Sequence, residues 1–175
     1  RVVLENLVQG GYTGTVYPVN PKYDGLKPAW TNGNVQPFAA QVNQLPDNGI
    51  DLAVIMTPKQ TVPAIVDELG KKGVKSVVVI SAGFGENGNK QLEAELKTAL
   101  QKHGMRMIGP NCVGVANGDP SVRMNATFVS GEVAPGRGAI MSQSGAVGID
   151  LIQKARLSGL GFARMASIGN QADVD

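Results

Sequence analysis

The chain has 175 residues, 42% hydrophobic and 17% charged, a balance that supports a buried core and excludes a disordered chain. The 16 Lys and Arg residues against 14 Asp and Glu give a net charge of +2, which is too small to indicate nucleic-acid binding. The 23 glycines and only 5% aromatic residues favour an α/β protein with tight strand-to-helix loops over a β-sandwich.

The sequence predicts a cytoplasmic protein. Cys112 is the only cysteine, so no internal disulfide can form and a reducing compartment is expected. No apolar run has transmembrane length, and the first residues lack the apolar core of a signal peptide. We therefore expect no membrane partner. Both ends look cut, because the chain opens inside a helix and the strand that normally begins a doubly wound domain is missing.

Short apolar runs alternate with helical stretches over the first part of the chain. A helix is expected at residues 1–9 and a strand at 16–19, which ends at Asn20. A polar segment with no clear period follows at residues 23–44, with a short helix over 39–44. Further strands are predicted at residues 51–57, 76–81 and 105–108, and helices at residues 61–72 and 90–102.

This alternation indicates βαβ units and a parallel, Rossmann-like sheet. The carboxyl ends of parallel strands fall on one edge of such a sheet, and ligands bind there. Four loops are expected to share that edge, and they begin at Asn20, Pro58, Ala82 and Gly109.

The alternation breaks at residues 119–135, which we interpret as the connection to a second α/β domain. We place the boundary between residues 125 and 126. The second domain is predicted to have strands at 138–141 and 162–168 and a helix at 146–157.

Two lysines follow the predicted strand ends. Lys22 and Lys59 each lie two residues past a strand, where an ammonium group can reach a phosphate. Each is equally compatible with a solvated surface lysine next to a turn.

The loop at residues 109–114 has the sequence GPNCVG. Pro110 stiffens the turn, and the Asn111 amide both donates and accepts, which suits an amide-rich ligand arm. From these residues alone an ordinary strand-to-loop turn is favoured, with Cys112 as a small buried side chain.

The segment Ser142-Gln143-Ser144-Gly145-Ala146 follows a strand and opens a helix. The first N–H groups of a helix lack internal partners and attract anions. Ser144 is also a good N-cap, and capping alone would explain it.

His103 is the only histidine, and its place at a helix end explains it structurally. No Ser-His-Asp or Cys-His arrangement can be built around it, and one Cys with one His makes no zinc site. No metal site is predicted.

Six motifs in a fixed order give the chain a family resemblance. Together they resemble the NDP-forming acyl-CoA synthetases, especially the ADP-forming acetyl-CoA synthetases, and more distantly the succinyl-CoA synthetase α-subunit. The motifs are YPVNPK at 17–22, ISAGF at 80–84, GPNCVG at 109–114, NATF at 125–128, SQSGA at 142–146 and SIGNQAD at 167–173.

The resemblance implies that residues 1–125 form a Rossmann-like CoA-binding domain and that residues 126–175 open a flavodoxin-like ligase domain. It implies that the helix start at Ser144, Gly145 and Ala146 holds the phosphate of a phosphohistidine or acyl phosphate in catalysis. It assigns contacts with CoA to Val19, Asn20, Lys22, Thr57, Pro58, Ser81, Ala82, Gly83, Asn111 and Cys112.

By the same resemblance, the complete enzyme interconverts acyl-CoA, phosphate and ADP with acid, CoA and ATP. The histidine that relays the phosphoryl group is expected beyond residue 175. An ATP-grasp subunit or fused domain is expected to bind ATP or ADP and magnesium, in an oligomeric assembly. Without these parts the piece should not catalyse the reaction, and without the first strand and its loop it should bind CoA more weakly than the complete enzyme.

Two alternatives stay open from the sequence. One is a regulatory domain of a protein lysine acetyltransferase that senses acyl-CoA without ligase chemistry. The other is an NAD(P)-dependent Rossmann oxidoreductase, although no G-x-G-x-x-G follows a strand in this chain.

Overall fold

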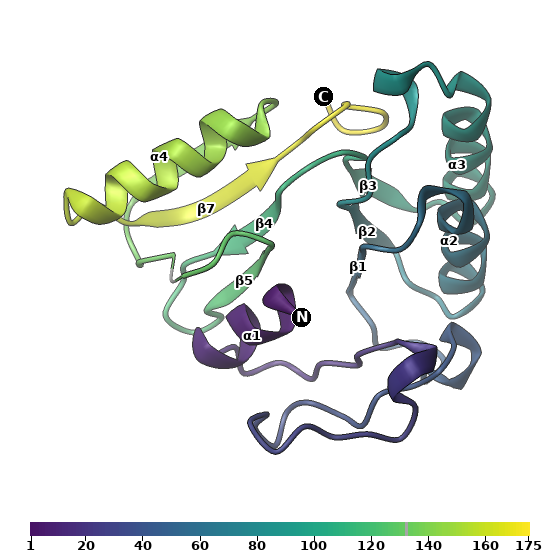
Figure 1. The fold of residues 1–175 in the computed structure, drawn as a ribbon, viewed down its shortest axis with the longest axis horizontal. Coiled ribbons are helices and arrows are strands. Elements are labelled where there is room, and N and C mark those ends of the chain that lie inside the picture. The colour runs from purple at the N-terminus through teal and green to yellow at the C-terminus, as the bar shows by residue number, and fades with distance from the viewer. Residues whose placement is uncertain (132) are drawn as a thin grey trace.

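The computed structural model describes residues 1–131 and 133–175, and its strands form two separate sheets (Figure 1). The first sheet has the order β1-β2-β3, and all of its strands are parallel. The predicted Rossmann-like parallel sheet is therefore confirmed. Its strands are β1 (Leu52–Ile55), β2 (Ser76–Val79) and β3 (Arg106–Ile108).

Two helices, α2 (Val62–Lys71) and α3 (Lys90–His103), cover one face of this sheet (Figure 1). The central strand β2 is a continuous β-branched run, as expected for a strand covered by neighbours. Gly104 ends α3 in the left-handed conformation, with φ 62°, and the chain turns directly into β3. The core between the helices and the sheet includes Val66, Leu69, Val77, Val79, Phe84, Leu96 and Met107.

The second sheet is mixed and has the order β5-β4-β7-β6. Strand β4 is antiparallel to both β5 and β7, whereas β6 and β7 are parallel and are joined through α4 (Gly145–Leu157). The strands are β4 (Gly114–Asn117), β5 (Met124–Thr127), β6 (Gly138–Ser142) and β7 (Phe162–Ser167).

The first helix, α1 (Val2–Gln9), packs on β5 of this mixed sheet. The buried Asn6 amide donates hydrogen bonds of 2.8 Å to the carbonyls of Thr127 and Val129, and these bonds fix the helix to the strand. The sequence predicted neither β4 nor β5. The predicted domain boundary between residues 125 and 126 falls inside β5 and stays a prediction.

The strand expected at residues 16–19 is wrong as a regular strand. Val16 and Val19 form only isolated bridges, with Val35 and Ala39. Pro18 has no N–H to donate, and the Phe38 N–H donates to the Leu26 carbonyl instead, so the pairing between the two segments is interrupted. The segment continues into two short 3₁₀ turns, η1 (Pro21–Tyr23) and η2 (Val42–Gln44), at one end of the molecule (Figure 1).

None of the helices formed by residues 1–131 and 133–175 combines the length and the apolar character that crossing a membrane would need.

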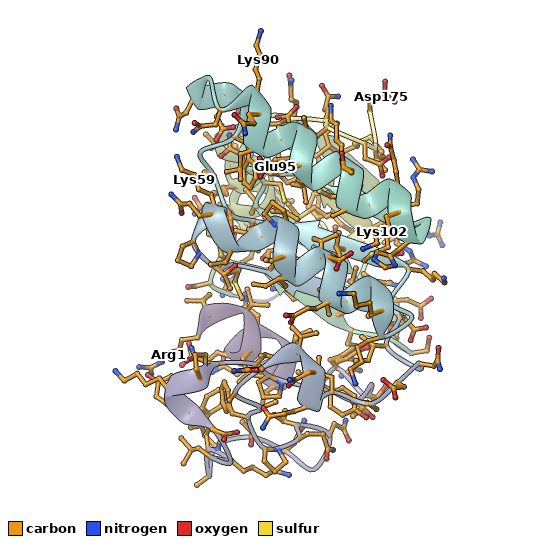
Figure 2. All side chains as sticks on the ribbon, turned by 90° about the vertical axis from the view of Figure 1, so that its right-hand side faces the viewer. Arg1, Lys59, Lys90, Glu95, Lys102 and Asp175 are labelled. Carbon is orange, nitrogen blue, oxygen red and sulfur yellow. The ribbon has the colours of Figure 1, made fainter. Side chains whose placement is uncertain are left out.

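Helices α2 and α3 are clamped together by Asp67, and Figure 2 shows them side by side with Lys102 near the end of α3. The Asp67 carboxylate accepts hydrogen bonds from Lys102 at 2.6 Å and from His103 Nε2 at 2.8 Å, and it pairs with Lys71 at 2.7 Å. These three partners, Lys102 first, hold the pKa of Asp67 well below its usual range. The His103 ring is thereby fixed over Gly70, where an added Cβ would overlap the ring Cγ.

We predict that Gly70→Ala lowers the free energy of unfolding by about 1–3 kcal/mol, because the new methyl group meets a ring that Asp67 holds in place. Helix propensity alone predicts the opposite, a gain of about 1 kcal/mol. Urea unfolding followed by circular dichroism measures the change.

The matched control is Gly148→Ala in α4, where an added Cβ has its nearest contacts at ordinary distances of 3.7 Å or more. The free energy of unfolding of this variant should rise by up to about 1 kcal/mol, because alanine has a higher helix propensity than glycine. Adding His103→Ala to Gly70→Ala should remove the penalty. If Gly70→Ala raises the free energy of unfolding as Gly148→Ala does, the proposed clash does not exist.

Candidate functional site

The loops that follow β1, β2 and β3 are joined at the carboxyl edge of the first sheet. Ser81 Oγ donates a hydrogen bond of 2.6 Å to the Thr57 carbonyl, and the Asn111 N–H donates one of 3.0 Å to the Ser81 carbonyl. Three of the four loops that the sequence placed at one edge therefore lie together.

A cavity of about 620 Å³ opens between this edge and the first turn of α4. One wall comes from the ends of β2 and β3, and the other comes from the mixed sheet, its helix α4 and the loop after β7. The lining residues are Ile80, Ala82, Asn111, Cys112, Val113, Phe128, Gln143, Ser144, Gly145, Ala146, Gly169 and Asn170.

The cavity brings together six of the predicted site residues. Ala82, Asn111 and Cys112, expected to contact CoA, line the same space as Ser144, Gly145 and Ala146, expected at the phosphate. The other predicted contacts are not part of this lining among the described residues, and they stay predictions: Val19, Asn20, Lys22, Thr57, Pro58, Ser81 and Gly83.

Sequence reasoning missed several lining residues that carry no signal of their own. Each of four such residues lies inside one of the six motifs: Val113 and Gln143 are next to residues that were singled out, whereas Phe128 and Asn170 are not. Membership of those motifs was the only signal that could have identified them.

The first turn of α4 is held close to the loop after β3. Ser144 Oγ accepts a hydrogen bond of 3.4 Å from the Val147 N–H, as the predicted N-cap should. A Cβ on Gly145 would lie 2.9 Å from Val113 Cγ2, so this position favours glycine. The leading N–H groups of a helix have no internal partners and give its start a positive potential, which attracts an anion into this side of the cavity.

The two lysines that follow the predicted strand ends differ in position. Lys59 borders the loop after β2, because a Cβ on Gly83 would lie 2.8 Å from its Nζ. Lys22 belongs to η1, where the Asn20 side chain accepts a hydrogen bond of 2.9 Å from its N–H and its ammonium lies 5.7 Å from the centre of the Tyr23 ring. Residues 16–19 are not a strand of the first sheet, and the contact of Lys22 with CoA stays a prediction.

The Gly83 N–H has a partner within the protein. The Glu86 carboxylate accepts hydrogen bonds from the N–H groups of Gly83 and Phe84 and from the side-chain amide of Asn170. Burial opposes ionisation of Glu86, but the bonds from Gly83, Asn170 and Phe84 outweigh it and hold its pKa below the usual value. The carboxylate is therefore charged at neutral pH.

Cys112 lines the cavity but is only 4% exposed, and its Sγ donates to the Val79 carbonyl at 3.3 Å. Burial raises the pKa of this thiol to about 11, so it is protonated at neutral pH and is a poor nucleophile. His103 is absent from the lining of the cavity, and it pairs with Asp67 on the outer helices. In the part of the chain that the structure describes, no three His, Cys, Asp or Glu side chains are grouped so as to hold a metal ion.

We predict that Cys112 reacts with iodoacetamide at pH 8 about 100-fold more slowly in the folded chain than in the urea-unfolded chain, since its pKa lies about two units above the ordinary value. Mass spectrometry of timed samples measures both rates. Comparable rates in the two states would show that this thiol is neither shielded nor held protonated.

Comparison with known proteins assigns both parts of the chain. Residues 1–118 match the CoA binding domain family, and residues 135–175 match the succinyl-CoA ligase-like flavodoxin domain. The chain is 41% identical over 175 residues to the α-subunit of acetate–CoA ligase [ADP-forming] I of Pyrococcus furiosus, and the match covers 99% of this chain and 37% of that protein. It is 40% identical over 174 residues to acetate–CoA ligase [ADP-forming] of Methanocaldococcus jannaschii, a match that covers 98% of this chain and 23% of that protein.

A solved structure gives the same result. The dinucleotide-forming acetyl-coenzyme A synthetase 1 of Ca. Korarchaeum cryptofilum, in complex with phosphate and ADP, superposes with a TM-score of 0.86 at 39% identity, over 99% of this chain and 35% of that one. The predicted resemblance to the ADP-forming synthetases is confirmed. The chain spans roughly a quarter to two fifths of the length of these relatives. The similarities favour neither the acetyltransferase domain nor the oxidoreductase.

Proposed function

Since the chain belongs to the family of CoA-binding domains, we propose that it is the CoA-binding part, and the start of the ligase domain, of an ADP-forming acyl-CoA synthetase. The whole enzyme would convert acyl-CoA, phosphate and ADP to acid, CoA and ATP, or run in reverse. One observation carries the proposal: the loop with Asn111 and Cys112 and the first turn of α4 line one cavity.

The two walls of the cavity suit the two reactants. The small side chain of Ala82 leaves space for the pantetheine arm, and the Asn111 amide offers a donor and an acceptor to the amide groups of that arm. The start of α4 offers a phosphate the N–H groups and the positive end of a helix dipole. A thioester entering along the first wall would therefore meet a phosphate held at the second.

The chemistry that follows is an acyl transfer. A phosphate oxygen attacks the thioester carbonyl, the C–S bond breaks, and CoA leaves as the thiolate while acyl phosphate forms. The fixed N–H groups at Ser144, Gly145 and Ala146 stabilise the negative charge on the phosphoryl group without having to reorganise. In the family pattern a histidine then takes the phosphoryl group, and we assign that role to a residue outside residues 1–175.

The remaining parts of the proposal concern the assembly. We propose that ATP or ADP and magnesium bind in an ATP-grasp subunit or fused domain, and that the assembly is an oligomer in the cytoplasm. The description of one relative as an α-subunit supports a separate partner, and the ADP and phosphate in the synthetase 1 complex support a nucleotide site in such enzymes. We also propose that the CoA-binding domain covers residues 1–125 and the ligase domain begins at residue 126.

Titration calorimetry with CoA, and with NAD⁺ as the competing dinucleotide, tests the proposal. We expect CoA to bind and NAD⁺ to give no heat. Ala82→Leu should weaken CoA binding at least about 10-fold by filling the cavity, since a misfitted side chain costs about 1.4 kcal/mol or more.

The matched control is Ala64→Leu on the exposed side of α2, which should leave the affinity unchanged. Binding of NAD⁺ in preference to CoA, or CoA binding that Ala82→Leu does not alter, would refute the proposed site.

A further inference from the structure

A line of hydrogen bonds joins the three loops that meet beside the cavity. The Glu86 carboxylate accepts from the N–H groups of Gly83 and Phe84 in the loop after β2. Its Oε2 also accepts from Asn170 Nδ2 in the loop after β7. Asn170 Oδ1 in turn accepts a hydrogen bond of 3.2 Å from Asn111 Nδ2 in the loop after β3.

The partners determine how the Asn170 amide is oriented. Its NH₂ group faces a charged carboxylate, and its oxygen faces the donor amide of Asn111, so both ends of the side chain are matched. The backbone N–H of Asn170 donates to the Pro110 carbonyl at 2.9 Å, and this bond fixes the backbone that carries the side chain. Asn170 also lines the cavity, together with Asn111 and Gly169.

We infer that Asn170 is a positioning residue that acts through Glu86 to hold the loops after β2 and β3 at a fixed separation where they form the CoA wall of the cavity. The inference rests on the proposed function, because it assigns that wall to CoA. Asn170 itself belongs to the ligase half of the chain. A residue of the ligase half of the chain thus sets the shape of the CoA wall.

Exchanging the two polar side chains tests this inference. Asn170→Asp is nearly isosteric and can still accept from Asn111, but it places a second carboxylate against Glu86, and the two repel. Glu86→Gln leaves one amide oxygen where the carboxylate served donors on both sides. In the double variant, which combines Glu86→Gln with Asn170→Asp, the introduced amide can donate to the introduced carboxylate and still accept from the Gly83 N–H, while the bond from the Phe84 N–H is lost. The bridge is then restored with its roles reversed and the net charge unchanged.

Amide exchange and CoA affinity are measured on the full chain for the parent and for each variant. Amide hydrogen exchange of the peptide 81–89, measured without ligand, should be about 10-fold faster in each single variant than in the parent, and the double variant should recover at least about 3-fold of that increase. CoA affinity should fall about 10-fold in each single variant and return to within about 3-fold of the parent in the double. Melting temperatures of all four proteins separate this pattern from general unfolding, because a merely structural loss would not be rescued by the exchange.

The outcomes are distinguishable. If exchange at 81–89 is unchanged in Asn170→Asp, the tether is absent and the inference is wrong. If exchange accelerates but CoA binds as in the parent, the tether does not position the CoA wall, and the inference is wrong while the proposed function stands. If the parent chain does not bind CoA, the proposed function is wrong and the inference fails with it. Should Asn170→Asp not fold, Glu86→Gln against the double variant makes the same comparison.

Discussion

The two sheets meet where the backbone of the loop after β7 runs against the backbone of the loop after β3. The N–H groups of Asn170 and Ala172 donate to the carbonyls of Pro110 and Gly109, and the Val113 N–H donates to the buried Ser167 Oγ. Gly169, with φ 56°, makes this approach possible, because a Cβ there would overlap the Pro110 carbonyl oxygen. The two walls of the cavity come from different sheets, and these backbone contacts hold the walls together.

The same contact brings two different kinds of group to one site: the side-chain amide of Asn111 on one wall, and the leading N–H groups at the start of α4 on the other. Asp173 extends this contact along β3, where its carboxylate accepts from the Met107 N–H at 2.7 Å and from Arg106 at 3.0 Å. A loop bonded to the backbone at so many points cannot slide along β3 without breaking several hydrogen bonds at once. The start of α4 and the Asn111 loop are therefore presented to a ligand as one surface, and preorganised surfaces of this kind bind without spending energy on ordering themselves.

The alternation of residues 52–108 was predictable because its signals are local. A β-branched run such as Ser76–Val79 and a glycine cap such as Gly104 need no distant partner to be recognised. The hairpin of β4 and β5 was not predictable, since its four-residue strands contain Asn117 and Asn125, and β4 is also paired with β7, which begins only at Phe162. The expected strand at 16–19 failed for the opposite reason: its β-branched pattern was local, but Pro18 within it has no N–H for the facing segment, so only isolated bridges form. Glu86 and Asn170 are 84 residues apart, and no spacing rule links them.

The shielding of Cys112 has a consequence for any ligand that carries a free sulfhydryl. A mixed disulfide forms when a thiolate attacks a sulfur that is already oxidised, in a disulfide or a sulfenic acid, and displaces a thiolate or hydroxide from it. A cavity wall that contains sulfur beside an incoming thiol would be liable to trap it covalently under mild oxidation. With its Sγ bonded to the Val79 carbonyl, Cys112 contributes polarisable bulk to the wall while remaining unavailable for exchange, so a thiol carrier could enter and leave this cavity repeatedly.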